Sequence, residues 1–138
     1  MSNAQAVTVI TGASRGIGAA LVQAFRNRNY RIVATSRSIK PCRDEDVVTV
    51  QGNVADPNTA DRVFKEALDR FGRVDTLVNN AGIFIPKPFT SYSNDDYASY
   101  IATNVTGFFH MTRRALELMS HAGRGHVVTV TSSLVDQR

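Results

Sequence analysis

Short apolar segments alternate with helical segments along the whole chain. Five segments rich in β-branched and other apolar residues have the length of buried strands, and they lie at residues 6–11, 31–36, 47–51, 74–79 and 127–132. Helical segments lie between them, from Ile17 onward, over 56–71, and from about 93 to 121. Strands that alternate with helices predict an α/β domain whose parallel sheet is covered on both faces.

Turn residues mark the ends of these helices. Asp56 is the expected N-cap of the second helix, and Gly72 fits its C-terminal stop. Ser93 or Asn94 is expected to cap the long third helix. Prolines within 83–92 predict a loop before that cap.

The order of the elements predicts the topology. Right-handed connections between parallel strands favour a doubly wound, Rossmann-type sheet with strand order 3-2-1-4-5. Ligands of such sheets bind beyond the carboxyl ends of the strands, where the order reverses. We expect residues 1–138 to form a single nucleotide-binding domain. The chain ends soon after the fifth predicted strand, so we expect a sheet that is incomplete on its C-terminal side, within a longer protein.

Composition and charge narrow the class of protein. The chain is 43% hydrophobic and 20% charged, with neither a long apolar run nor a basic-then-apolar N-terminus. Its single cysteine, Cys42, cannot form an internal disulfide, which favours a cytoplasmic location. The net charge of +4 is spread along the chain, and the histidines have no metal-ligand spacing. We therefore expect no membrane, nucleic-acid or metal partner.

Small and polar residues gather where three predicted strands end. The first strand runs into Thr11-Gly12-Ala13-Ser14-Arg15-Gly16-Ile17-Gly18, the fourth into Asn79-Asn80-Ala81-Gly82 and the fifth into Thr131-Ser132-Ser133. A packed core does not require this arrangement, whereas a bound ligand does. Gly12 permits a sharp turn from strand to helix, and Gly16 and Gly18 let a pyrophosphate approach the amides at the helix N-terminus.

These segments resemble the short-chain dehydrogenase/reductase family. The matching features are Thr11-Gly12-x-x-x-Gly16-x-Gly18, Asn79-Asn80-Ala81-Gly82, Asn104 in the long helix and Ser132 after the fifth strand. The resemblance covers the whole chain and implies that loop 11–18 holds the adenosine and pyrophosphate half of a dinucleotide. It also implies that 79–82 support the central sheet and the adenine-ribose side. Asn53 stands where the family usually has an Asp that binds the adenine amine, and it fits a turn after the third strand equally well.

The end of the second strand bears on the choice between nicotinamide dinucleotides. It reads Thr35-Ser36-Arg37, without the acidic residue that NAD enzymes place against the ribose hydroxyls. Arg37, with Arg15 in the glycine loop, would attract a 2′-phosphate, which favours NADP(H) over NAD(H). The expected cofactor-binding residues are Thr11, Gly12, Ser14, Arg15, Gly16, Ile17, Gly18, Ser36, Arg37, Asn53, Val54, Asn80, Ala81 and Gly82.

The resemblance implies two catalytic residues within this chain. Asn104 begins a row of poor helix formers, and the family has there a local distortion that exposes a backbone carbonyl and holds a catalytic water. The alternative is an Asn satisfied by a neighbouring loop. Ser132 resembles the family's catalytic serine, which holds the substrate carbonyl oxygen. The alternation of Val128 and Val130 makes Ser132 the last residue of the predicted strand, and Ser133 is the alternative if the strand ends later.

The family's Tyr-x-x-x-Lys motif is not found in this chain, since Tyr92, Tyr97 and Tyr100 have no lysine four residues on. We expect an oxidoreductase that interconverts a carbonyl and an alcohol by hydride transfer with NADP(H), on a small-molecule substrate and, at full length, as a homo-oligomer. The 138-residue chain alone is expected to lack full catalysis, because it supplies no group for proton transfer. The alternative function is an NADP(H)-binding module without turnover.

Overall fold

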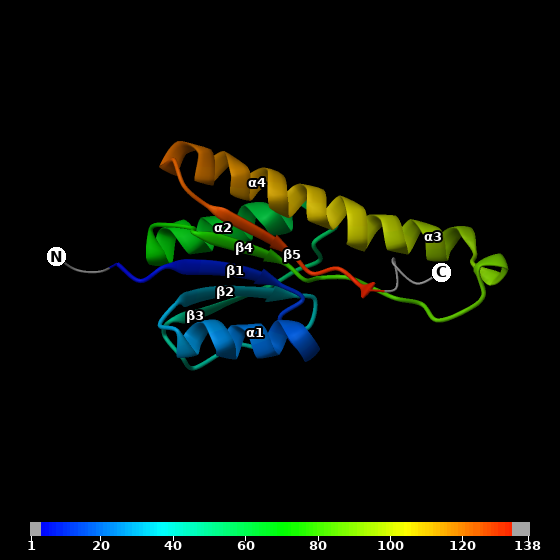
Figure 1. The fold of residues 1–138 in the computed structure, drawn as a ribbon, viewed down its shortest axis with the longest axis horizontal. Helices are drawn as coiled ribbons and strands as arrows, with labels where there is room; N and C mark the ends of the chain where they lie inside the picture. The colour runs from blue at the N-terminus through cyan, green and yellow to red at the C-terminus, as the bar shows by residue number, and fades with distance from the viewer. Residues whose placement is uncertain (1–3, 134–138) are drawn as a thin grey trace.

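The computed structural model describes residues 4–133 and contains a five-stranded parallel sheet between layers of helices (Figure 1). The strands are β1 (Val7–Thr11), β2 (Arg31–Ser36), β3 (Val47–Gln51), β4 (Thr76–Asn79) and β5 (His126–Thr129). They lie in the order β3-β2-β1-β4-β5, and every neighbouring pair is parallel. This arrangement confirms the expected doubly wound α/β fold and its strand order.

The helices lie where the sequence predicts them, with two differences. They are α1 (Gly16–Asn27), α2 (Pro57–Phe71), the 3₁₀ helix η1 (Phe89–Ser91), α3 (Asn94–Tyr100), the π-helix η2 (Ile101–Thr106) and α4 (Gly107–Ala122). The single helix expected from about 93 to 121 is one long rod in which a π segment separates two α-helices (Figure 1). The short η1 occupies part of the segment predicted as a loop.

Different helices bury the two faces of the sheet (Figure 1). On one face, Ile10, Ile32 and Val78 form an apolar cluster with Leu21 and Phe25 of α1. The opposite face lies under α2 and α4. Adjacent strand residues serve opposite faces because their side chains alternate.

The larger core cluster lies under α2 and α4. Val9, Val33 and Leu77 of the sheet meet Phe64 of α2 and Met111 of α4, and each of these side chains is at most 1% exposed. Full burial of one such side chain contributes about 1.5–3 kcal/mol. The cluster therefore fixes α2 and the long helix against the sheet.

Helix ends follow the predicted turn chemistry. The Asp56 carboxylate accepts a hydrogen bond from an amide of the first turn of α2 at 2.9 Å, and Gly72 ends that helix with a left-handed φ of 74°. Ser93, rather than Asn94, caps α3. Its Oγ accepts from the Asp96 amide at 3.1 Å, while the Asp96 carboxylate accepts from the Ser93 amide at 2.9 Å.

The last strand is shorter than expected, because β5 ends at Thr129 whereas the prediction reached residue 132. Its neighbour β4 ends at Asn79, and the last ladder bond runs from the Val130 amide to the Asn79 carbonyl at 2.9 Å. The prediction that Ser132 is the last residue of the strand is therefore wrong. β1 and β4 also begin slightly later than predicted, at residues 7 and 76.

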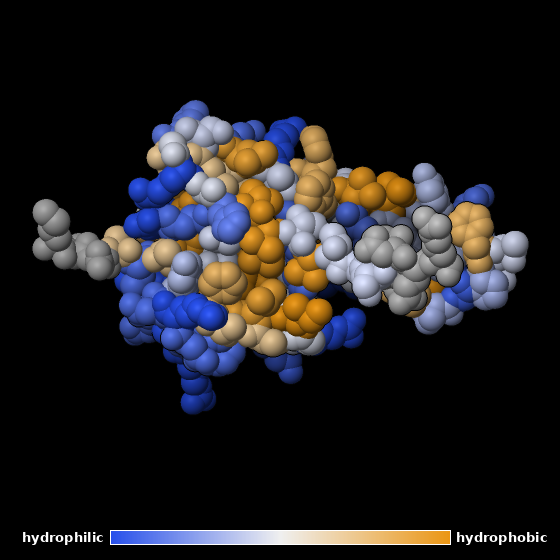
Figure 2. Space-filling view, in the orientation of Figure 1, coloured by the Kyte–Doolittle hydropathy of each residue, from blue (hydrophilic) through white to orange (hydrophobic). Residues whose placement is uncertain are grey.

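One side of the sheet is open in the part of the chain that the structure describes. There, β5 pairs with β4 and with no further strand. Val128 and Val130 are 37% and 38% exposed, and apolar side chains reach the surface over β4 and β5 beside α1 (Figure 2). This open side of the sheet, along β5, adjoins the carboxyl ends of the strands, where the candidate site is found.

Candidate functional site

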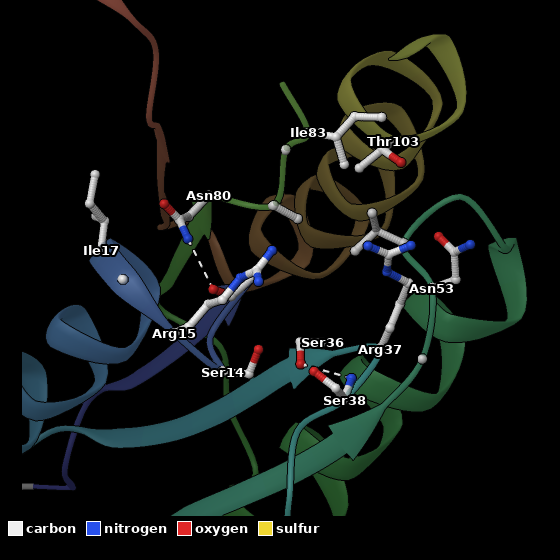
Figure 3. A pocket seen from close by; sticks show the side chains of 16 residues that line it. Ser14, Arg15, Ile17, Ser36, Arg37, Ser38, Asn53, Asn80, Ile83 and Thr103 are labelled. Atoms are coloured by element: carbon white, nitrogen blue, oxygen red, sulfur yellow. Dashed lines mark hydrogen bonds between the residues drawn. The ribbon is translucent and has the colours of Figure 1, made fainter. Parts of the chain in front are cut away.

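A pocket opens at the carboxyl edge of the sheet, where β1, β2 and β4 end (Figure 3). Its volume of about 600 Å³ is in the range of cavities that hold small ligands and cofactors. Twelve of the expected cofactor-binding residues line it: Gly12, Ser14, Arg15, Gly16, Ile17, Ser36, Arg37, Asn53, Val54, Asn80, Ala81 and Gly82. Of the other two, Thr11 lines the neighbouring second cavity, and Gly18 packs against the carbonyl of Gly12.

The glycines of segment 11–18 are required for different physical reasons. Gly12 has a left-handed φ of 63°, and a Cβ there would lie 2.9 Å from the Cα of Ala81. A Cβ on Gly18 would lie 2.0 Å from the Gly12 carbonyl oxygen, so any larger residue would push α1 away from the strand. Gly16 also has a left-handed φ, of 56°, but no atom lies within 4 Å of the position of a Cβ. Gly12 and Gly18 therefore permit close packing, whereas Gly16 leaves open space at the pocket.

The N-terminus of α1 differs from those of α2 and α3. Asp56 caps α2 and Ser93 caps α3, but no side chain among residues 4–133 caps α1. The N-cap residue of α1 is Arg15, and its first turn contains no acidic residue. The amides of this turn keep their partial positive charge for a ligand. An anion such as a pyrophosphate fits this end of the helix.

Asn80, which lies at the pocket (Figure 3), and Thr11 hold the ends of β4 and β1 together. The Asn80 Nδ2 donates to the carbonyls of Thr11 and Gly12 at 3.2 Å each. Thr11 is buried, and its Oγ1 accepts from the amides of Asn80 and Ala81 at 3.0 and 2.9 Å. These bonds fix the glycine loop relative to β4.

The end of β2 contributes hydroxyls and a cation. The Ser36 Oγ accepts a hydrogen bond from the Ser38 amide at 3.2 Å. The side chains of Arg15 and Arg37 lie on two sides of the pocket, with Ser14 and Ser36 at its base (Figure 3). No acidic residue is among the described residues that line this pocket. A phosphate between the two guanidiniums would therefore meet attraction without repulsion from a carboxylate in the lining.

Asn53 lines the pocket and also closes a turn. Its Oδ1 accepts from the Ala55 amide at 3.0 Å, and its carbonyl accepts from the Asp56 amide at 3.0 Å. A turn residue and an adenine-binding residue are therefore compatible interpretations of Asn53. Since the side-chain oxygen already has one partner in the turn, one lone pair remains for a base amine. Next to it, Val54 is buried so closely against α4 that a Cβ on Gly107 would lie 2.5 Å from its Cγ2.

A second cavity of about 540 Å³ adjoins the first, between β4, β5 and the long helix. Its wall includes the apolar side chains of Phe84 and Phe108 together with the two expected catalytic residues, Asn104 and Ser132. Ser133 is not among the described residues of this wall. The structure thus brings Asn104 and Ser132 to one cavity next to the pocket.

Asn104 lies in η2, where the expected distortion takes the form of a π segment. The Gly107 amide donates to the Ala102 carbonyl, five residues back, and passes over the carbonyl of Thr103, its usual helical partner. The Asn104 side chain bonds to the facing loop, because its Oδ1 accepts from the Ile83 amide at 2.8 Å and its Nδ2 donates to the Ile83 carbonyl at 3.1 Å. The helix is thus distorted at Asn104, and the Asn104 side chain is satisfied by the facing loop. The catalytic water implied by the family resemblance stays a prediction.

Two tyrosine hydroxyls hold the next part of the same loop. Tyr100 Oη accepts from the Ile85 amide at 2.5 Å, and Tyr92 Oη donates to the Ile85 carbonyl at 2.6 Å. The hydrogen bond with Tyr100 raises the pKa of Tyr92. Lys87 pairs with Asp96 and lowers the pKa of that carboxyl. These contacts and the two bonds between Asn104 and Ile83 fix the loop that contributes to the walls of both cavities.

Four residues that line the first pocket were not predicted, namely Ser38, Gly52, Ile83 and Thr103. The sequence contains a signal for Ser38, since a serine that follows Ser36 by two residues favours a local turn. It contains no such signal for Ile83 and Thr103. Their positions depend on the contact between segments 21 residues apart that Asn104 makes.

Residues 4–133 contain neither a metal-binding cluster nor a membrane-spanning helix. Within this range, no group of three or more His, Cys, Asp or Glu side chains could hold a metal ion. No helix in the same part of the chain has the length and apolar character needed to cross a membrane. The candidate site consists of the two adjoining cavities at the carboxyl edge of the sheet.

Known proteins share this sequence pattern. The family model of the short chain dehydrogenases matches residues 6–138. The chain is 30% identical to acetoacetyl-CoA reductase of Cupriavidus necator over 93% of its length, and 32% identical to 3-oxoacyl-[acyl-carrier-protein] reductase of Synechocystis sp. over 91% of its length. These matches cover 56% and 55% of the two enzymes, so the chain spans about half the length of the curated relatives it matches.

Solved structures share the fold. ElxO with NADP bound superposes with a TM-score of 0.85 at 28% identity, over 93% of this chain and 56% of that one. A short-chain dehydrogenase from Streptomyces avermitilis gives a TM-score of 0.87 at 30% identity, over 95% of this chain and 50% of that one. Because the family model matches almost the whole chain and the fold agrees with it, the chain belongs to the short-chain dehydrogenase/reductase family, a family of oxidoreductases.

Proposed function

We propose that the protein binds NADP(H) at the carboxyl edge of its sheet and acts in an oxidoreductase that interconverts a carbonyl and an alcohol. The observation that carries the cofactor proposal is a pocket with Arg15 and Arg37 on two sides and no acidic residue in its described lining. ElxO, which is 28% identical to this chain, has NADP bound in its solved structure. The charge of the pocket favours the dinucleotide that carries a 2′-phosphate.

The residues present fit such a dinucleotide. Gly16 leaves open space beside the first turn of α1, and no described side chain caps that turn. The turn would hold the pyrophosphate. Ser14, Ser36 and the two arginines would hold the 2′-phosphate, and Asn53 would face the adenine.

The second cavity is the proposed place of reaction. Bound NADPH would supply a hydride to the substrate carbonyl, and bound NADP⁺ would accept one from the alcohol in the reverse direction. Ser132 would donate a hydrogen bond to the carbonyl oxygen of the substrate, and the apolar wall suits a small compound with an apolar part. Asn104 would keep the facing loop in place through its two bonds to Ile83. The reductases among the relatives support carbonyl chemistry as the reaction class.

Titration calorimetry of the 138-residue chain with NADPH and NADH tests the cofactor proposal. We expect NADPH to bind about tenfold more tightly or better, since a hydrogen bond to a charged group contributes about 1.5–3 kcal/mol. Arg37→Asp is expected to remove the preference, because a carboxylate repels a 2′-phosphate. Equal affinity of the parent for the two dinucleotides would refute the NADP(H) proposal.

A control variant and an activity assay complete this test. Arg43→Asp makes the same change of charge at a residue that is not among those lining the pocket, and it should leave the preference intact. Oxidation of NADPH in the presence of a panel of small carbonyl compounds tests the reaction. Turnover would favour the enzyme over the binding module, and it would contradict the expectation that the 138-residue chain alone lacks full catalysis.

A further inference from the structure

A side-chain hydrogen bond from the edge strand reaches the backbone of Arg37. Gln51 ends β3, and its Nε2 donates to the Arg37 carbonyl at 2.8 Å. Ser36 and Gln51 are register partners, and the Gly52 amide donates to the Ser36 carbonyl at 3.0 Å. The Gln51 bond therefore lies just beyond the end of the β2–β3 ladder, where the strand no longer restrains the chain.

Gln51 is held in turn from α2. The Arg62 Nη2 donates to the Gln51 carbonyl at 3.0 Å. Gly52 permits this approach, because a Cβ there would lie 2.7 Å from the Arg62 Nη2. A continuous set of contacts thus runs from α2 through Gln51 to the backbone of Arg37.

We propose that Gln51 is a positioning residue for the choice of dinucleotide, because it holds the Arg37 backbone so that the guanidinium stands beside the pocket. This inference rests on the proposed function, in which Arg37 receives the 2′-phosphate. Gln51 is not among the described residues that line the pocket, so it acts through Arg37 and not by touching the cofactor. A long cationic side chain loses conformational freedom when it binds phosphate, and a backbone that is already fixed lowers this loss.

Calorimetric titration of Gln51→Met with NADPH and NADH tests the proposal, because methionine keeps the length of the side chain and removes the donor. We expect NADPH to bind about fivefold more weakly, as for the loss of one hydrogen bond, and NADH affinity to stay within about twofold. Gln23→Met is the matched control, since Gln23 Nε2 also makes an exposed hydrogen bond, to Asn27 at 2.9 Å, and does not line the pocket.

A double-mutant cycle tests whether Gln51 acts through Arg37. In an Arg37→Ala background, Gln51→Met should have no further effect on NADPH affinity. The proposal is overturned by an unchanged ratio of NADPH to NADH affinity in Gln51→Met, or by an equal loss for both dinucleotides. A parent that binds both equally overturns the proposed function itself, so the parent titration tells the two failures apart.

Discussion

At the scale of single residues, two glycines allow backbone conformation to be separated from ligand binding. Gly16 and Gly123 have left-handed φ values of 56° and 71°, and neither has an atom within 4 Å of the position of a Cβ. Gly16 lines the pocket, whereas Gly123 follows the C-terminus of α4. The two positions therefore share the same backbone requirement and differ in their distance from the proposed phosphate site.

Alanine substitution at these two glycines gives a matched prediction. Gly16→Ala and Gly123→Ala should each lower the free energy of unfolding by about 1–2 kcal/mol through left-handed strain. Only Gly16→Ala should also weaken NADPH binding, by about tenfold, because a methyl group would keep the phosphate from the helix amides. Thermal unfolding and calorimetry measure the two effects. If Gly16→Ala binds NADPH as the parent does, the phosphate does not approach this loop.

Residues of the site could be predicted where their chemistry coincides with a strand end. Gly12, Arg15 and Arg37 follow predicted strands closely, and a parallel topology brings those ends to one edge. The roles of Gln51 and Ile83 were not predicted, since they depend on hydrogen bonds to residues 14 and 21 positions away. No local pattern records such pairs, so they are found only once the chain is folded.

At the scale of elements, the long helix could be predicted in its extent but not in its interior. Its start follows from the cap at Ser93, and its end from the glycine at 123. A single π segment leaves no trace in an apolar spacing of three and four residues, and only the poor helix formers around Asn104 indicated a distortion. The end of β5 could not be predicted from its own residues, because it depends on where β4 ends.

The long helix also anchors the loop in front of it, which leads to a prediction for Tyr100. Tyr100→Phe removes the acceptor for the Ile85 amide and the contact with the Tyr92 hydroxyl at 3.4 Å. We expect amide hydrogen exchange over residues 83–92 to accelerate about fivefold, with little change in Tm because the core under the helix is untouched. Tyr97→Phe, at a 66% exposed residue of the same helix, is the control. Unchanged exchange in Tyr100→Phe would show that the hydroxyl does not hold the loop.

At the scale of the whole molecule, the two edges of the sheet have different tasks. The carboxyl edge forms the candidate site, and the amino edge ties the strands together through Asp75. This carboxylate accepts from the Val7 amide at 2.8 Å, pairs with Arg73 at 2.6 Å, and lies 3.5 Å from Arg124, which precedes β5. Burial raises the pKa of Asp75, but the bonds from Arg73 and Val7 outweigh it, so the pKa of Asp75 is lowered.

The lowered pKa of Asp75 makes the stability of the domain depend on pH. An unfolded Asp has a pKa of about 3.9, so the ionised carboxylate stabilises the fold above about pH 4, and this contribution is lost as the pH falls through the folded pKa. Asp75→Asn should therefore lower the free energy of unfolding by about 1–3 kcal/mol at pH 7 and by less at pH 3. Urea unfolding at the two pH values measures both differences.

Asp61→Asn is the control for this prediction, because the Asp61 side chain is 68% exposed and lies 3.5 Å from Arg114. Its loss should be within about 0.5 kcal/mol at either pH. An equal loss for Asp75→Asn at pH 7 and pH 3 would assign the effect to packing instead of charge. Because Asp75 lies at the edge opposite the pocket, the folded Asp75→Asn variant should bind NADPH as the parent does. A changed NADPH affinity would mean that the amino edge also controls the geometry of the glycine loop. The effect would pass through β1 and the short strand β4, which run from the amino edge to the pocket.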